Sequence, residues 1–242
     1  EGLTTINRYA FQNCTSLVSI DLPDSITTMA ARSFYNCTKL AEVGYPAGWT
    51  TVLDYNNQSS TYWEDGRSYY TSPFQGCTAL KKIEIDEGVT SIPKHAFRYV
   101  TALEEVVLPE SLTNIGAYAF DGCTALATVG LNEGLTTIGS YAFQGCTALK
   151  AVATPEALTT INDHAYKDCT GLNSLTLNEG LSSIGNYAFE NCTGLKSVTV
   201  PATITVLNEG AFYGCTGLTA VSLPEGLTTI NRYAFQNCTS LV

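Results

Sequence analysis

The sequence predicts an α/β repeat solenoid, in which short units of one kind stack on one another along the chain. Three observations lead to this prediction: a fixed spacing of cysteines, a motif that recurs around each of them, and a stretch of alternating apolar and polar residues in each unit. Self-similarity at a fixed period of about 20–50 residues is the signature of repeat architectures.

The fixed spacing comes from nine cysteines, and six of the eight gaps between them are 23 residues long. The gap between Cys77 and Cys123 is twice as long, with Val100 at its midpoint. The gap between Cys37 and Cys77 is 40 residues, which is one repeat with 17 additional residues. The chain therefore contains ten repeats, one of which carries an insertion. The cysteines are Cys14, Cys37, Cys77, Cys123, Cys146, Cys169, Cys192, Cys215 and Cys238.

Each repeat is expected to contain a strand, a turn, a second apolar pair and a compact segment, in that order. Residues 172–177 (LNSLTL) alternate between aliphatic and small polar residues, which predicts a strand with one buried face. A turn with a proline or an acid follows, as at residues 109–110, and then an apolar pair such as Leu135 and Ile138. The compact segment, for example residues 139–143, is expected to form a short helical turn or an irregular connection.

The recurring pattern LxxIxLPxxLxxIxxxAFxxCT resembles the BspA-type leucine-rich repeat of large bacterial surface proteins. The resemblance covers all ten repeats. It implies a right-handed leucine-rich-repeat superhelix, with a parallel β-sheet on the concave side and short helical turns or irregular segments on the convex side. It also implies an extracellular or cell-surface location and a link with adhesion.

We expect a single solenoid domain of residues 1–242, with incomplete repeats at both ends. Residues 1–18 recur unchanged as residues 225–242, and neither end carries the polar capping repeat that solenoids need for solubility. This predicts a segment of a longer array, or a unit that stacks end to end into a filament. A designed overlap or a truncated chain is the alternative explanation of the identical ends.

Composition and motifs argue against several classes of function. The net charge of −10 disfavours nucleic acid, whose phosphates attract basic proteins. No apolar run reaches the length of about 18–20 residues that spans a membrane, so we expect no membrane insertion within this segment. Motifs of serine hydrolases, metalloproteases and phosphate-binding loops are missing from the sequence. We therefore expect no enzyme activity and no cofactor.

The cysteines are interpreted as a ladder of buried free thiols. Their number is odd and no CxxC pair occurs, which disfavours a disulfide framework and a metal site. Val100 stands at the same position in one repeat, so the position accepts an apolar side chain. Neighbouring repeats lie about 4.8 Å apart, and distance alone therefore leaves disulfides between them possible.

The histidines and carboxylates also follow the repeat. His95 and His164 are three repeats apart, too far to share a metal ion, and stand where most other repeats have tyrosine. The acids form one column in the turns, which we interpret as a solvated edge, with weak cation binding as the alternative. The column contains Asp24, Glu87, Glu110, Glu133, Glu156, Glu179 and Glu225.

The main departure from the repeat is an aromatic-rich insertion, which we place at residues 45–73 within the third repeat. Loops on a rigid scaffold often carry function, and exposed tryptophan and tyrosine suit protein contacts and stacking on sugar rings. A structural flap that covers an irregular edge is the alternative. The candidate ligand-binding residues are Trp49, Tyr55, Tyr62, Trp63, Asp65, Arg67, Tyr69 and Tyr70.

Two functions follow from these observations. The first is an extracellular structural and adhesive scaffold, as part of an array or a filament. The second is a discrete recognition module that binds a host protein or a glycan through the insertion.

Overall fold

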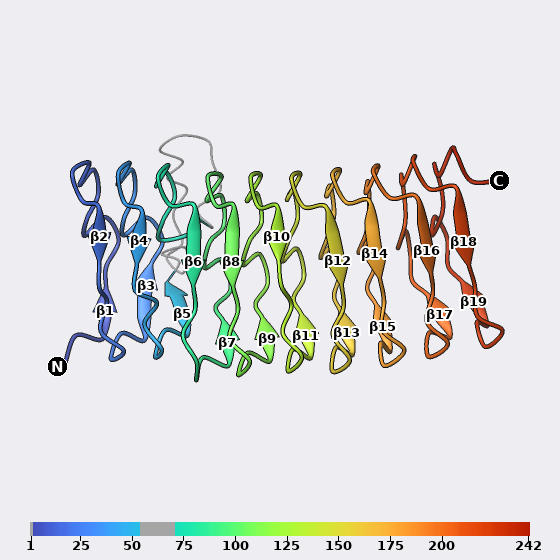
Figure 1. Ribbon diagram of the computed structural model, residues 1–242, viewed down its shortest axis with the longest axis horizontal. Helices are drawn as coiled ribbons and strands as arrows, with labels where there is room; N and C mark the ends of the chain where they lie inside the picture. The colour runs from blue at the N-terminus through green and yellow to red at the C-terminus, as the bar shows by residue number, and fades with distance from the viewer. Residues whose placement is uncertain (1, 54–70) are drawn as a thin grey trace, which may run out of the picture.

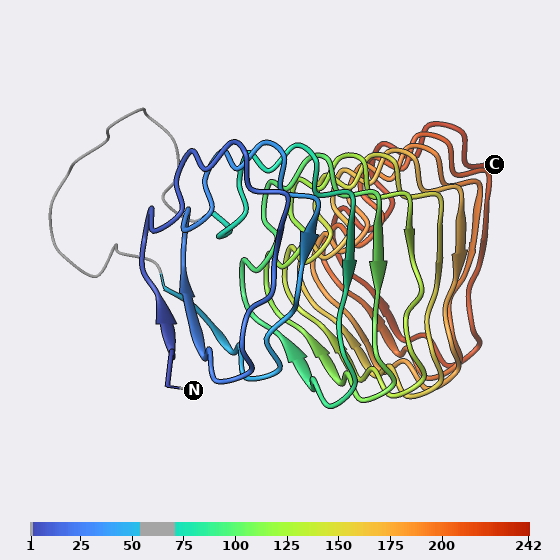
Figure 2. The same cartoon turned by 60° about the vertical axis from the view of Figure 1, so that its left-hand side comes forward.

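The computed structural model describes residues 2–53 and 71–242 as a parallel-strand β-solenoid. The coils follow one another in chain order along one axis, and the two termini lie at opposite ends (Figure 1). Seen obliquely, they form a series of similar loops (Figure 2). Each coil corresponds to one repeat of the sequence, so sequence period and stacking period coincide.

Two rows of short strands run along the stack. The first row contains β2 (Ser19–Ile20), β4 (Glu42–Val43), β6 (Lys82–Glu84), β8 (Glu105–Val107), β10 (Thr128–Val129), β12 (Ala151–Ala153), β14 (Ser174–Thr176), β16 (Ser197–Thr199) and β18 (Ala220–Ser222). The second row contains β1 (Thr5–Ile6), β3 (Thr28–Ala30), β5 (Thr51–Leu53), β7 (Ser91–Ile92), β9 (Asn114–Ile115), β11 (Thr137–Ile138), β13 (Thr160–Ile161), β15 (Ser183–Ile184), β17 (Val206–Leu207) and β19 (Thr229–Ile230).

All strand pairs are parallel and join equivalent residues of neighbouring coils. Ile138 of β11 pairs with Ile161 of β13, and Val152 of β12 pairs with Leu175 of β14. This register stacks similar side-chain types, so each inward aliphatic packs against its counterpart one coil away. The first row contains the parallel strands that the alternating stretch predicts, divided among four sheets, whereas the second row was not predicted.

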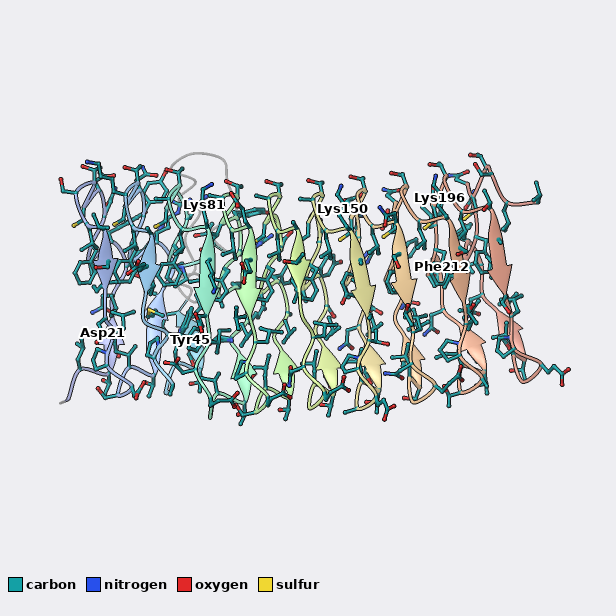
Figure 3. All side chains as sticks on the ribbon, in the orientation of Figure 1. Asp21, Tyr45, Lys81, Lys150, Lys196 and Phe212 are labelled. Carbon is teal, nitrogen blue, oxygen red and sulfur yellow. The ribbon has the colours of Figure 1, made fainter. Side chains whose placement is uncertain are left out.

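The core is a set of columns that run the length of the stack. The aromatic column stacks ring on ring, with centroids 5.3 Å apart between Phe120 and Phe143 and 5.2 Å apart between Phe143 and Tyr166. Phe212, in the same column, is fully buried inside its coil (Figure 3). Stacked rings bury a large apolar area and add a specific ring contact, worth about 0.5–1.5 kcal/mol per pair.

The prediction of short helical turns is wrong, because the residues that the structure describes contain no helix. The compact segments are corners built from irregular turns. In one of them, Tyr141 and Gly145 adopt φ of 60° and 69°, which a right-handed helix cannot accommodate. The corners are joined to each other instead: Phe120 N donates to Ala142 O of the next coil at 2.8 Å.

The register also fixes where the insertion begins and ends. Leu53 pairs with Ala30 and accepts a hydrogen bond from Ala31 N at 3.0 Å. Pro73 O accepts one from Phe34 N at 2.9 Å, as the equivalent carbonyl does in the regular corners. The extra 17 residues are therefore residues 54–70, outside the described residues. Residues 45–53 and 71–73, which the sequence assigned to the insertion, belong to the regular coils.

Candidate functional site

Trp49 is a core residue, so it leaves the set of candidate ligand-binding residues. It lies one repeat after Ile26, is 1% exposed, and its indole Nε1–H donates to Thr51 O at 2.9 Å. Tyr45 lies one repeat after Leu22 and is 4% exposed. Both positions hold aliphatic residues in the neighbouring coils, and a ring that is buried in this way offers no face to a ligand.

The other seven candidate ligand-binding residues lie outside the described part of the chain. They are Tyr55, Tyr62, Trp63, Asp65, Arg67, Tyr69 and Tyr70.

The two rings at positions 45 and 49 form an aromatic wedge, together with Phe74 and Phe97 of the aromatic column. Trp49 meets Phe74 and Phe97 edge-on, with centroids 6.2 and 6.0 Å away. Tyr45 lies 5.3 Å from Trp49. Phe74 and Phe97 are 5.9 Å apart, the widest separation in the aromatic column among the described residues. The rings of the column are thus slightly further apart at the level of the wedge than elsewhere.

The wedge coincides with an interruption of the backbone hydrogen bonds between stacked coils, which we call the seam. The seam divides the stack into an N-terminal block and a C-terminal block. The last coil of the N-terminal block contains residues 41–53 and 71–77, and the first coil of the C-terminal block contains residues 80–100. Across the seam β4 does not pair with β6, and β5 does not pair with β7. The corner bonds also stop here. Within the described residues, these two coils share one backbone hydrogen bond. It runs from Leu80 N to Cys77 O, where the chain passes from the first coil to the second.

A cleft of about 570 Å³ opens where the seam reaches the first row. Its walls are the edges of β4 and β6, and Lys81, which Figure 3 labels, lies beside the β6 wall. The small residues Ala41 and Gly44 on the β4 wall, and Ala79 before β6, leave room beside the backbone. The lining residues are Ala41, Glu42, Val43, Gly44, Ala79, Lys81, Lys82 and Glu84.

No motif of the sequence predicts this cleft, although one signal for it is present. Tyr45 and Trp49 follow Leu22 and Ile26 at the repeat distance, so they interrupt two aliphatic columns of the stack. Their aromatic character instead led to their assignment to the insertion.

All nine cysteines are free, and every one except Cys14 is buried. Each buried thiol donates to a carbonyl of the aromatic column one coil back, as Cys146 Sγ does to Phe120 O at 3.3 Å. Burial raises the pKa of the Cys77 thiol to about 12 and that of Cys146 well above its usual range. These thiols therefore stay protonated and take no part in nucleophilic chemistry at neutral pH.

The acidic column is exposed, but its members do not simply splay into solvent. In several coils the carboxylate accepts a hydrogen bond from a backbone N–H of the next coil. Glu87 Oε1 receives one from Glu110 N at 3.0 Å, and Glu179 Oε2 receives one from Ala202 N at 3.0 Å. The acids thus help to hold the turns together. Among the described residues, no cluster of three metal-ligating side chains occurs.

The two histidines belong to a second aromatic column at the corners. Tyr118, Tyr141, His164 and Tyr187 stack with centroid separations of 4.6, 4.5 and 5.3 Å. His95 continues the column below Tyr118 at 5.0 Å. All five residues have positive φ, a conformation that is costly for large side chains. The histidines thus have a packing role within this column.

Comparisons with known proteins agree on the fold. A family model described as "BspA type Leucine rich repeat region (6 copies)" matches residues 1–64, 68–192 and 136–242. A leucine-rich cell surface protein from Faecalibacterium prausnitzii is 24% identical, with a TM-score of 0.51 over 99% of this chain and 82% of that one.

Two further solved structures are similar. A leucine-rich repeat protein of T. pallidum is 22% identical, with a TM-score of 0.54 over 98% of this chain and 82% of that one. A leucine-rich repeat protein from Eubacterium ventriosum is 21% identical, with a TM-score of 0.50 over 100% of this chain and 76% of that one. No curated protein sequence matches the chain. No helix in the described residues is long and apolar enough to span a membrane.

Proposed function

Because the chain belongs to the BspA-type leucine-rich repeat family, we propose that it is a scaffold of a bacterial cell surface that presents residues 54–70 to a protein or glycan partner. The proposal includes an adhesive role and an extracellular location. The similar protein of Faecalibacterium prausnitzii is described as a cell surface protein, which supports this location. The net charge of −10 supports a partner other than nucleic acid.

One observation carries the proposal: the coil register is the same on both sides of the insertion. Leu53 pairs with Ala30 and Pro73 continues the corner, as the equivalent residues of a regular coil do. The 17 residues are thus added to a complete coil rather than replacing part of one. A segment that the fold does not need is the natural place for a recognition function.

The test is deletion of residues 54–70, with Leu53 joined directly to Thr71. The intact chain and the deletion are compared on an immobilised panel of glycans and extracellular-matrix proteins. We expect the deletion to fold and to lose the binding of the intact chain. A second variant, with a Gly-Ser segment of the same length in place of residues 54–70, controls for spacing. Equal binding by all three proteins would contradict the proposal.

The second candidate function is a discrete recognition module. In this case residues 54–70 are carried by a single separate particle rather than by an array of stacked units. Electron micrographs of the protein from its source distinguish the two. Long uniform fibres are expected for an array or filament, and short separate particles for a recognition module.

Self-association is favoured by a comparison of two identical segments. Ile6 and Ile230 occupy the same place in residues 1–18 and 225–242, but Ile6 is 4% exposed and Ile230 is 49% exposed. Ile6 pairs with Met29 of the following coil, whereas Ile230 is left open among the described residues. Sedimentation at increasing protein concentration is expected to reveal association. Ile230→Lys should weaken it, and Thr136→Lys, on the exposed side of the stack, should not.

We also propose that the chain is not an enzyme and takes no cofactor. The raised pKa of the buried thiols supports this, as does the separation of the two histidines within a packed column. A scaffold needs neither ionised thiols nor ionised histidines.

A further inference from the structure

The cleft between β4 and β6 has a wall of unpaired backbone groups on its β4 side. In a parallel ladder, alternate residues of a strand direct their N–H and C=O groups to one neighbour. Gly44 N donates to Ile20 O of β2 at 3.0 Å, so Gly44 faces β2. The intervening residue Val43 faces the cleft, and no described residue bonds to its N–H or C=O.

The β6 wall also has backbone N–H and C=O groups that are unpaired in the described part of the chain, and they point into the cleft from the side opposite β4. The flanking residues Lys81 and Ile85 bond to β8: Glu105 N donates to Lys81 O at 3.1 Å, and Ile85 N donates to Val107 O at 3.1 Å. Lys82 and Glu84 therefore face the cleft with their backbone groups unpaired among the described residues. The two walls together offer backbone donors and acceptors to both edges of a strand placed between them.

From these edges we propose that the cleft is an acceptor site for an extended peptide, which joins the first row as an added parallel strand between β4 and β6. Addition of a strand to an exposed sheet edge is a general mode of peptide recognition, in which main-chain hydrogen bonds supply the affinity. Here both sides of the peptide backbone would be paired. The small residues Ala41, Gly44 and Ala79 along the walls allow its backbone to approach.

The cleft must widen to admit a strand, and the seam makes this possible. Paired strands lie about 4.8 Å apart, so an inserted strand needs about 9.6 Å between its neighbours. The nearest Cα atoms of β4 and β6 lie within 8 Å. The walls must therefore part by at least about 1.6 Å. Among the described residues, this breaks no backbone hydrogen bond between stacked strands or corners, because neither strand row nor the corners are bonded across the seam.

The other interruptions of the first row lack this freedom. β10 does not pair with β12, and β14 does not pair with β16. There, however, the corners that follow these strands remain bonded: Phe143 N donates to Ala165 O at 2.8 Å, and Phe189 N donates to Ala211 O at 2.9 Å. These coils are held at their normal spacing, so the acceptor site is restricted to the seam.

The charge around the cleft favours a basic peptide. Lys81 pairs with Glu104 at 2.7 Å, and Lys82 contacts Glu84 at 3.5 Å and Glu105 at 3.8 Å. Both ammonium groups are thus neutralised within the described residues. Glu42, exposed at the β4 wall, has no ion-pair partner in that part of the chain and is available to a lysine or arginine of the ligand.

The test uses a blocked nine-residue peptide that copies residues 79–87 but carries lysine in place of the glutamate at position 84. A fluorescent label reports its binding to the intact chain by anisotropy. The matched control peptide has proline in place of the isoleucine at position 83, which removes one N–H and interrupts the ladder. We expect saturable binding of the first peptide, and at least tenfold weaker binding of the second.

Two protein variants and hydrogen exchange locate the site. Glu42→Lys should weaken binding several-fold, while Ser174→Lys, at the equivalent exposed position of β14, should leave it unchanged. Bound peptide should slow amide exchange at residues 43–45 and 82–84 but not in β10 or β12. The proposal is overturned if the peptide does not bind, if the proline peptide binds equally well, if Glu42→Lys has no effect, or if protection appears elsewhere. None of these readouts depends on residues 54–70.

Discussion

At the scale of single residues, the cysteine position combines apolar burial with one hydrogen bond. The thiol of Cys169 is fully buried and donates to Phe143 O at 3.1 Å. That carbonyl belongs to the aromatic residue of the previous coil, so each thiol fastens two coils together. Val100 fills the same position without a donor, which indicates that size and burial matter more than the hydrogen bond.

The burial of the thiols predicts their reactivity. In the native protein N-ethylmaleimide should modify Cys14 first, because it is exposed, and Cys238 second, because at 9% exposure it is the most accessible of the buried thiols. The other seven thiols are buried with raised pKa values and should react only after unfolding. Mass spectrometry of peptides after timed labelling measures this order. Equal rates for Cys14 and Cys146 in the native state would contradict it.

His95 predicts a loss of stability in acid. Burial, together with the positive charges of Arg98 and Lys94, lowers its pKa to about 3. The His95 side chain binds a proton near pH 6.5 in the unfolded chain, but not in the folded chain. The contribution of neutral His95 to the free energy of unfolding is therefore complete above pH 6.5 and is lost as the pH falls toward 3. At pH 5 we expect a loss of about 1–2 kcal/mol relative to pH 8.

His95→Tyr separates this effect from the other titrations. Tyrosine occupies the same position at Tyr118 with a similar φ of 58°, so the backbone accepts the change. Urea unfolding at pH 8 and pH 5 should give a smaller difference in the free energy of unfolding for the variant than for the native chain. The same difference in both proteins would show that His95 is not responsible.

At the scale of elements, the columns, not the individual strands, determine the structure. Strands of two or three residues have little stability alone, and each is fixed by the coils stacked on either side of it. Tyr45 and Trp49 change two of these columns at once. They lie at the point where both rows and the corners, in the part of the chain that the structure describes, lose their backbone hydrogen bonds.

The two tryptophans should therefore differ in their effect on stability. Trp49→Ala removes a fully buried indole and its hydrogen bond to Thr51 O, and should cost about 3–5 kcal/mol. Trp63→Ala, in residues 54–70, should leave the free energy of unfolding unchanged within about 0.5 kcal/mol. Chemical denaturation of both variants makes the comparison. A similar cost for both would assign a structural role to the insertion as well.

These elements also show how far the sequence leads. The stretch of residues 172–177 predicts the first row correctly, because Ser174, Leu175, Thr176 and Leu177 are enough to reveal a period of two. The second row was missed because a pair such as Thr137 and Ile138 is too short to show alternation. The helical turns were expected from compact segments, but a sequence does not display the positive φ of Tyr141. The cleft depends on the absence of backbone hydrogen bonds across the seam, in both strand rows and in the corners of the described chain. A local sequence pattern does not reveal such an absence.

At the scale of the whole molecule, the seam divides a solenoid that would otherwise be uniform. In a repeat protein, stability is the sum of the intrinsic terms of the coils and the interfaces between neighbours. At the seam the interface keeps its aromatic contacts, such as Phe74 on Phe97, but has no backbone hydrogen bonds between stacked strands or corners within the described residues. Its coupling term should be smaller than that of any other interface.

This predicts that the N-terminal block unfolds before the rest of the stack. Two coils, each one position from an end, provide a matched comparison: residues 28–37 in the N-terminal block and residues 206–215 near the C-terminus. Both have neighbours on two sides, so fraying affects them equally. Residues 206–215 lack strand pairing to the preceding coil but keep its corner bonds, such as Phe189 N to Ala211 O at 2.9 Å, whereas the seam has neither among the described residues. In native-state hydrogen exchange with increasing urea, amides of residues 28–37 should lose protection at a lower concentration. If the two coils lose protection together, the aromatic wedge alone couples the blocks as strongly as a complete ladder does, and the cleft between β4 and β6 would not part easily enough to admit a strand.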